Sequence, residues 1–199
     1  MKKGTIIIIA IVGIVALCAI WGVGVYNKLV NGEESVSQAW SQVENAYKRR
    51  ADLIPQLVST VQGAANYEKG TLTEVIEARA KATSVQVDAN NLTEANVAQF
   101  QKAQDALTGA LSRGLNVIVE RYPELTATQG FRDLQVQLEG TENRIATERG
   151  RFNDAVAAYN KTIRRFPNNI VAGISGFEKK GYFTAPEGSD EPVKVEFDF

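Results

Sequence analysis

Residues 126–166, TATQGFRDLQVQLEGTENRIATERGRFNDAVAAYNKTIRRF, decide the fold of this chain. Large apolar side chains recur in this stretch at the three- and four-residue steps that bring side chains to one face of an α-helix. They are Phe131, Leu134, Leu138, Ile145, Phe152, Val156, Tyr159, Ile163 and Phe166. Such a long stripe predicts a single amphipathic helix of about 60 Å, because an α-helix rises about 1.5 Å per residue.

A second amphipathic segment lies earlier in the chain and is expected to pack against the first. Its apolar side chains are Val36, Trp40, Val43, Tyr47, Ile54, Leu57 and Val61. Ser35 is expected to cap the start of this helix, because a serine side chain accepts hydrogen bonds from the exposed backbone N–H groups there. Pro55 lies inside the segment, where its missing N–H and its ring predict a kink.

Two shorter segments between these helices complete a bundle. Helical periodicity predicts one helix over residues 71–84 and another that begins at Thr93 and that Pro123 ends or bends. No part of this region alternates apolar and polar residues between turn signals, as a strand does. We therefore predict an all-α fold in which residues 27–166 form an antiparallel bundle of long helices.

Residues 5–26, TIIIIAIVGIVALCAIWGVGVY, form an uncharged apolar stretch behind a short tail, residues 1–4. At about 1.5 Å per residue, the stretch is just long enough to cross a hydrocarbon core of about 30 Å. A cleaved signal peptide is the alternative, but its apolar region usually runs only about 7–15 residues. Cys18 resembles a lipoprotein acylation site, yet Leu17 fits that motif poorly, so a buried apolar thiol is the better interpretation.

The charges that flank this stretch predict its orientation in a membrane. Lys2 and Lys3 precede it, whereas Lys28 on the far side is followed by Glu33 and Glu34. Positively charged flanks tend to stay in the cytoplasm. The N-terminus is therefore expected to be cytoplasmic, with the bundle in the periplasm or on the cell surface.

Residues 167–199 are expected to form an irregular tail, because asparagine, glycine and proline recur there and break helices. The end of the tail has a different pattern. Val193, Val195, Phe197 and Phe199 alternate with charged residues, which is typical of a half-buried strand. Such a strand needs an edge to pair with, so these four residues are a candidate interaction strand, and a disordered end is the equal alternative.

Two arginines, Arg50 and Arg79, fall on the apolar stripes of predicted helices. A buried charge must be paired or must reach solvent, because an unpaired ion costs several kcal/mol to bury. We predict an ion pair inside the bundle between Arg50 and either Glu148 or Glu142, with a role in fixing helix register. The functional alternative is that Arg50 and Arg79 bind an anionic ligand.

The expected register follows from the ends of the two apolar stripes. If Val36 packs near Phe166, antiparallel packing sets Arg50 level with Phe152. Glu148 then lies one helical turn from Arg50, within reach of its guanidinium group.

The composition excludes several kinds of chemistry. The chain has no histidine, so the usual general base and the commonest metal ligand are both absent. Cys18 lies in the apolar stretch, and no phosphate-binding or serine-nucleophile motif occurs. With 22 basic and 23 acidic residues, the chain lacks the basic excess of a nucleic-acid-binding protein. We predict no catalytic, cofactor-binding or metal-binding residues and no nucleic-acid partner.

Several separated blocks match the motifs of one known family in order and spacing. They are YNKLVNGEESVSQAWSQVENAYKRRADLIPQLVSTVQGAANYE at residues 26–68, YPEL at 122–125, residues 134–167, and the pairs 176–177 and 182–183. In these blocks the chain resembles the LemA family of bacterial membrane proteins. The resemblance implies one N-terminal membrane helix, a helical domain and the bacterial inner membrane. For some members it also implies association with membrane-bound proteases and envelope stress.

Three functions from different classes fit these features. The first is a non-enzymatic scaffold or adaptor whose bundle binds other envelope proteins or further copies of itself. The second is a membrane-remodelling or lipid-binding protein, which needs a basic or amphipathic face toward lipid. The third is a carboxylate-dependent enzyme, which needs paired acids in a cleft, and a narrow bundle rarely supplies one. We expect the scaffold or adaptor.

Overall fold

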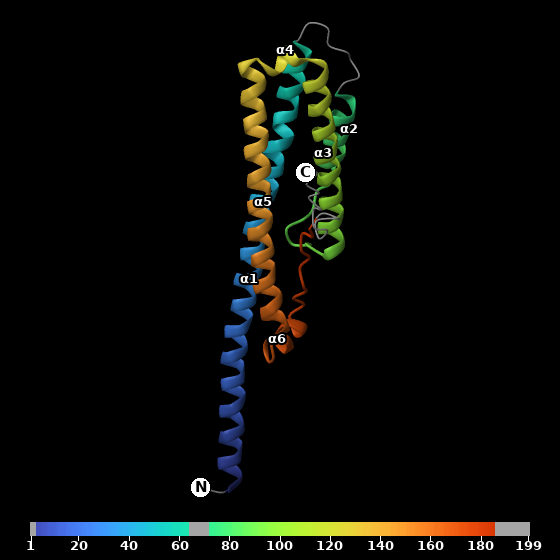
Figure 1. The fold of residues 1–199 in the computed structure, drawn as a ribbon. Helices are drawn as coiled ribbons and strands as arrows, with labels where there is room; N and C mark the ends of the chain where they lie inside the picture. The colour runs from blue at the N-terminus through green and yellow to red at the C-terminus, as the bar shows by residue number, and fades with distance from the viewer. Residues whose placement is uncertain (1–2, 64–71, 186–199) are drawn as a thin grey trace, which may run out of the picture.

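The computed structural model describes residues 3–63 and 72–185 of the chain (Figure 1). In these two ranges the regular structure is entirely helical, and six helices follow one another along the chain. The predicted all-α class is therefore confirmed. The candidate interaction strand, Val193, Val195, Phe197 and Phe199, lies outside the described residues.

Helix α1, Lys3–Gln62, is a single helix of 60 residues that carries both the apolar stretch and the first bundle segment. The prediction that Ser35 caps a new helix is wrong: its hydroxyl donates to the Asn31 carbonyl oxygen at 2.8 Å, a bond made inside a helix. Gly32 does not interrupt α1, and it gives room to Tyr159, whose Cδ2 would lie 3.1 Å from an added Cβ.

Pro55 lies within α1, and the helix continues beyond it to Gln62. Proline has no N–H to donate to the carbonyl group four residues earlier, which here belongs to Ala51. Arg79 supplies the missing donor, because its Nε lies 2.7 Å from the Ala51 oxygen. The backbone cost of the proline is thus offset by a side chain from a neighbouring helix.

Helix α5, Gln129–Arg164, runs antiparallel to the C-terminal half of α1, as Figure 1 shows. Thr128 caps its start by accepting a hydrogen bond from the Phe131 N–H. The predicted register is wrong by ten residues, because Phe152 packs against Trp40 instead of lying level with Arg50. The prediction assumed that the stripe of α5 ends in Phe166, but that side chain is 80% exposed.

Helices α2, α3 and α4 pack against the end of the α1–α5 pair that lies away from the N-terminal stretch. Helix α2 is Thr73–Ser84, and α3 is Glu94–Arg121, capped by the Thr93 hydroxyl, which accepts from the Asn96 N–H. Pro123 ends α3 and begins the short α4, Pro123–Thr126, as a proline in the first turn does. This segment reverses the chain before α5.

Helix α6, Asn168–Ile174, lies in the part of the tail that was predicted to be irregular. The prediction that asparagine and glycine break any helix there is wrong for these seven residues. Residues 177–185 then run back along the bundle without regular structure, and we call them the strap. Gly176 makes the reversal with a φ of 74°, which favours glycine.

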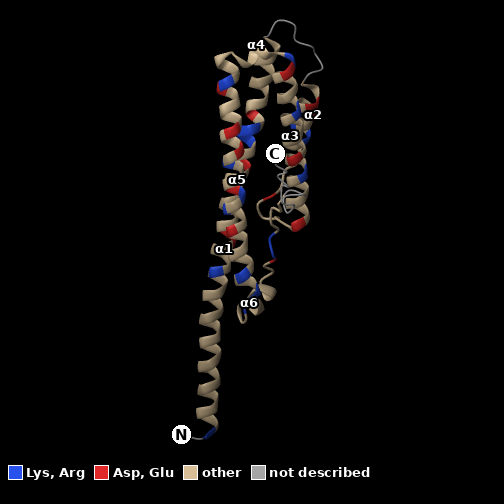
Figure 2. Ribbon diagram, viewed as in Figure 1, with Lys and Arg blue, Asp and Glu red and all other residues tan. Residues whose placement is uncertain are grey.

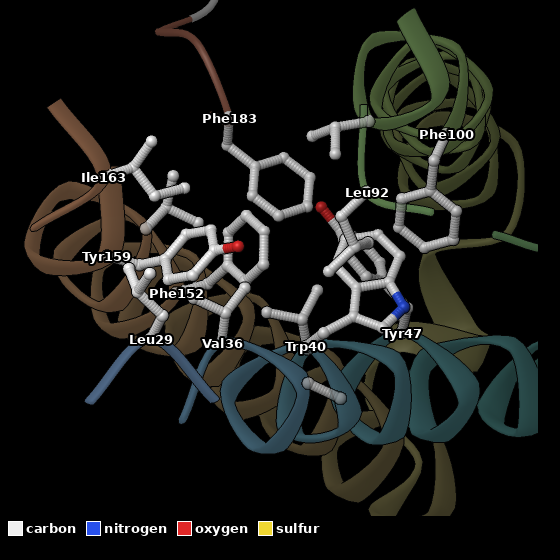
Figure 3. Close-up of a cluster of buried hydrophobic side chains, with 14 of the residues drawn as sticks. Leu29, Val36, Trp40, Tyr47, Leu92, Phe100, Phe152, Tyr159, Ile163 and Phe183 are labelled. Atoms are coloured by element: carbon white, nitrogen blue, oxygen red, sulfur yellow. The ribbon is translucent and has the colours of Figure 1, made fainter. Parts of the chain in front are cut away.

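The buried side chains form two cores. The core nearer the N-terminal stretch is rich in aromatic rings (Figure 3). Trp40 lies at its centre, with ring centroids of Phe100, Phe152 and Phe183 at 5.1, 5.4 and 5.9 Å. The second core is mostly aliphatic and fills the space among α1, α2, α3 and α5 at the far end.

The first part of α1 projects beyond the bundle. It is long and apolar enough to cross a membrane, and none of its most apolar 18-residue window is buried against the protein. No charged residue occurs between Lys3 and Lys28, and Figure 2 shows charges reappearing where α1 meets the level of α6.

Candidate functional site

A buried polar layer crosses the middle of the bundle around Arg50, whose side chain is 1% exposed. Its Nη1 donates to the Thr108 hydroxyl at 2.6 Å and to Glu142 Oε1 at 2.9 Å. Its Nη2 donates to the backbone oxygen of Gln104 at 3.1 Å and to Gln104 Oε1 at 2.8 Å. One guanidinium group thereby joins α1, α3 and α5.

The charge of Arg50 is balanced by one carboxylate that reaches solvent. The Glu142 side chain is 37% exposed, so water stabilises one end of the pair while the other end is dry. The Tyr47 ring lies 5.0 Å from the guanidinium carbon, a cation–π distance. Arg50 Nε has no hydrogen-bond partner among the described residues. The buried guanidinium group is therefore stabilised through its two terminal nitrogens, which bind Thr108, Gln104 and Glu142.

The other predicted members of this cluster lie elsewhere. Arg79 binds the backbone of α1, as described above. Glu148 is buried but faces Arg151 at 3.1 Å and Arg144 at 3.9 Å, both on its own helix. The structure thus brings Arg50 to Glu142 and away from Glu148 and Arg79.

A cleft of about 800 Å³ opens beside this layer, between α1, α2 and α3. Its charged lining residues are Glu44, Lys48, Asp52, Arg79 and Asp88. Both signs of charge are present, so the cleft has no uniform field that selects an anion or a cation. Among the described residues, no three His, Cys, Asp or Glu side chains cluster as metal ligands do.

Glu44 is the lining residue whose environment most resembles that of a catalytic acid. Burial raises the pKa of its carboxyl group, and the nearby Trp40 side chain partly opposes the rise. The described lining residues include no serine, cysteine or histidine, and the Thr83 hydroxyl donates to backbone carbonyls of α2. What this cleft offers is a mixed polar surface for binding.

The strap is held by three amide side chains, each of which binds both the N–H and the C=O of one strap residue. Asn160 binds Lys180 at 2.9 and 3.0 Å. Asn153 binds Phe183 at 2.9 Å in both bonds, and Gln101 binds Thr184 at 3.0 Å in both. These contacts recognise backbone and so hold an extended peptide.

Specific side chains fix the strap in one position. Phe183 inserts into the aromatic core beside Trp40 (Figure 3). The Lys180 ammonium lies 2.6 Å from Glu33, which ties the strap to α1. At Gly181, an added Cβ would lie 2.5 Å from the Glu94 Cα, so only glycine fits.

Sequence reasoning missed this arrangement. The available signal was a set of amides on otherwise apolar stripes, namely Gln101 and Gln104 on α3 and Asn153 and Asn160 on α5. A buried amide needs hydrogen-bond partners. For Gln101, Asn153 and Asn160 the partners are backbone groups of the strap, a segment with no periodicity that would reveal it in the sequence.

The fold and these sites define a class: a helical-bundle protein carried on an N-terminal helix that is long and apolar enough to cross a membrane. The sequence model of the LemA family matches residues 39–197, and the chain belongs to this family. The resemblance seen in its motifs is thereby confirmed.

Named relatives agree with that assignment. The chain is 27% identical to Protein LemA of Metamycoplasma hominis over 165 residues, which covers 83% of this chain and 71% of that protein. It is 28% identical to Magnetosome protein MamQ of Magnetospirillum gryphiswaldense over 187 residues, covering 84% and 68% respectively. To Magnetosome protein MamQ 2 of Paramagnetospirillum magneticum it is 34% identical over 91 residues, covering 46% and 33%.

Proposed function

We propose that this protein is a non-enzymatic scaffold or adaptor anchored in the bacterial inner membrane. The observation that carries the proposal is the continuity of α1, which joins the apolar stretch to the bundle without a break. An uninterrupted helix transmits the orientation of its membrane segment to the domain it enters. Such a rod presents a binding surface at a fixed height above the membrane.

The buried sites support a structural role. Arg50 is bonded to protein acceptors on three helices, and we assign to its pair with Glu142 the fixing of helix register. The cleft supplies charges of both signs and no nucleophile–base pair among its described lining residues. Protein partners at the envelope, a membrane protease among them, and further copies of this chain are the proposed ligands.

The orientation and the chain terminus complete the proposal. On this proposal the N-terminus lies in the cytoplasm and the bundle in the periplasm or on the cell surface, because Lys2 and Lys3 put positive charge before the apolar stretch. Gln101 binds Thr184 near the end of the strap. Further along the chain, residues 193–199 are the proposed interaction strand.

Crosslinking of the full-length protein in native membranes, followed by mass spectrometry, tests this function. Exposed lysines occur along the bundle, so a lysine-reactive reagent reports which face is occupied. They are Lys48, Lys81, Lys102, Lys161 and Lys179. We expect reproducible crosslinks from the bundle to other envelope proteins or to a second copy. The control is the apolar helix alone, residues 1–34, which retains Lys2, Lys3 and Lys28. Recovery of the same partner proteins with that control would overturn the proposal.

A further inference from the structure

Helix α6 and Phe166, two residues before it, carry exposed apolar side chains beside the N-terminal stretch. Phe166, Ile170 and Ile174 are 80%, 51% and 83% exposed. Ile170 and Ile174 are four residues apart in α6, which puts them on one side of the helix. Outside the N-terminal stretch, Phe166 and Ile174 are the most exposed large apolar side chains of the described residues.

The position of this face is set by α1. Ile174 and Val171 line a shallow groove of about 330 Å³ whose other wall is Ala19, Gly22 and Val23. A hydrocarbon core of about 30 Å takes up about 20 helical residues, so a span that begins near Thr5 ends near residue 25. Ile174 therefore lies at the depth of the last apolar turns of the span.

Contacts around the groove hold α6 at this depth. The rings of Tyr26 and Phe177 meet edge to face at 5.6 Å, which fixes the end of α6 to α1. Ala172, on the inner side of α6, is buried in the aromatic core. The outward face with Ile170 and Ile174 is the side that this packing leaves uncovered.

Charge complements this apolar face. Exposed basic residues flank α6 along the chain: Arg164 and Arg165 precede it, and Lys179 follows it. The first charge after the span on α1 is Lys28. Figure 2 shows blue segments, which mark Lys and Arg, on the parts of the chain close to α6. Basic residues that flank an apolar face suit the boundary between acyl chains and anionic headgroups.

We propose that the face formed by Phe166, Ile170 and Ile174 is embedded in the lipid leaflet on the bundle side of the membrane. The bilayer is the occupant because the face continues the surface of the span at the same depth. The bundle then touches the membrane at two places, the span and α6, and two contacts restrict its tilt. This holds for either orientation of the span.

Site-directed spin labelling of the full-length protein in lipid nanodiscs tests the inference. Labels are placed singly by Ile174→Cys and, as a matched exposed position far from the span, Val136→Cys. Both variants also carry Cys18→Ser, since Cys18 is the sole cysteine. Accessibility to oxygen, which partitions into acyl chains, is compared with accessibility to a water-soluble nickel chelate. We expect position 174 to be reached by oxygen and shielded from nickel, and position 136 to show the reverse.

Other outcomes separate the alternatives. A label introduced by Ile14→Cys reports whether the span itself is in the bilayer, and it must be reached by oxygen before position 174 is judged. Equal nickel accessibility at positions 174 and 136 would overturn the proposal, because α6 would then lie in water. Shielding of position 174 from both reagents would also overturn it, because protein would then cover the face.

Discussion

Replacing Trp40 by alanine is expected to lower the free energy of unfolding of the bundle by about 3–5 kcal/mol, the usual cost of removing a large aromatic side chain from a core. Trp40 is fully buried and contacts rings from α3, α5 and the strap. Phe183 stacks on it with an interplanar angle of 13°, so the strap loses this ring contact. Urea unfolding of the full-length protein in detergent, followed by circular dichroism, measures the loss.

Trp21 provides the matched control, because the chain has only two tryptophans and this one is exposed near the end of the span. Trp21→Ala is expected to leave the unfolding transition of the bundle unchanged. Hydrogen exchange in residues 177–185 should rise in Trp40→Ala alone, as the strap loosens. Equal unfolding midpoints for the two variants would contradict the central place given to Trp40.

The pair between Arg50 and Glu142 is expected to respond asymmetrically to mutation. Glu142→Ala leaves the buried Arg50 cation without a counter-charge, which costs about 3 kcal/mol or more. Arg50→Met leaves Glu142, which already reaches solvent, and an apolar replacement of a buried charge is often nearly neutral. We expect Arg50→Met to cost about 1 kcal/mol or less, by the same reasoning. The same unfolding measurement compares the two.

The double variant tests the cause. Arg50→Met combined with Glu142→Ala should be more stable than Glu142→Ala alone, because the unpaired cation is gone. Glu139→Ala, an exposed carboxylate one turn away on α5, is the matched control and should change stability by less than about 0.5 kcal/mol. A Glu142→Ala variant as stable as this control would show that Arg50 does not depend on Glu142.

The long helices were predictable because their apolar stripes are regular and their caps and prolines are local signals. Thr93 and Pro123 mark helix ends in the structure as they do in the sequence. Ser35 misled the prediction, because a serine also fits inside a helix when its hydroxyl bonds the preceding turn. Helix α1 is continuous because no strong helix breaker lies between the span and the bundle. A residue that can cap a helix, such as Ser35, does not by itself interrupt one.

Register and the strap were beyond sequence reasoning for physical reasons. Apolar stripes specify which faces meet, but sliding one helix along the other by whole turns preserves the same match. The true register is set by particular fits, such as Gly32 with Tyr159 and Trp40 with Phe152. The strap is positioned by amide bonds to its backbone, and these leave no pattern in its own residues.

The proposed function requires α1 to be one rigid rod from the membrane into the bundle. Pulsed electron–electron double resonance on the full-length protein in nanodiscs measures the distance between two spin labels. The labels are introduced by Ile20→Cys and Val136→Cys in a Cys18→Ser background. Trp40 lies level with Phe152, which sets Val136 level with residue 56, about 54 Å along the axis from position 20. A continuous, rigid α1 predicts one narrow distance distribution near that value. A broad or two-peaked distribution would reveal a hinge between the span and the bundle and would contradict it.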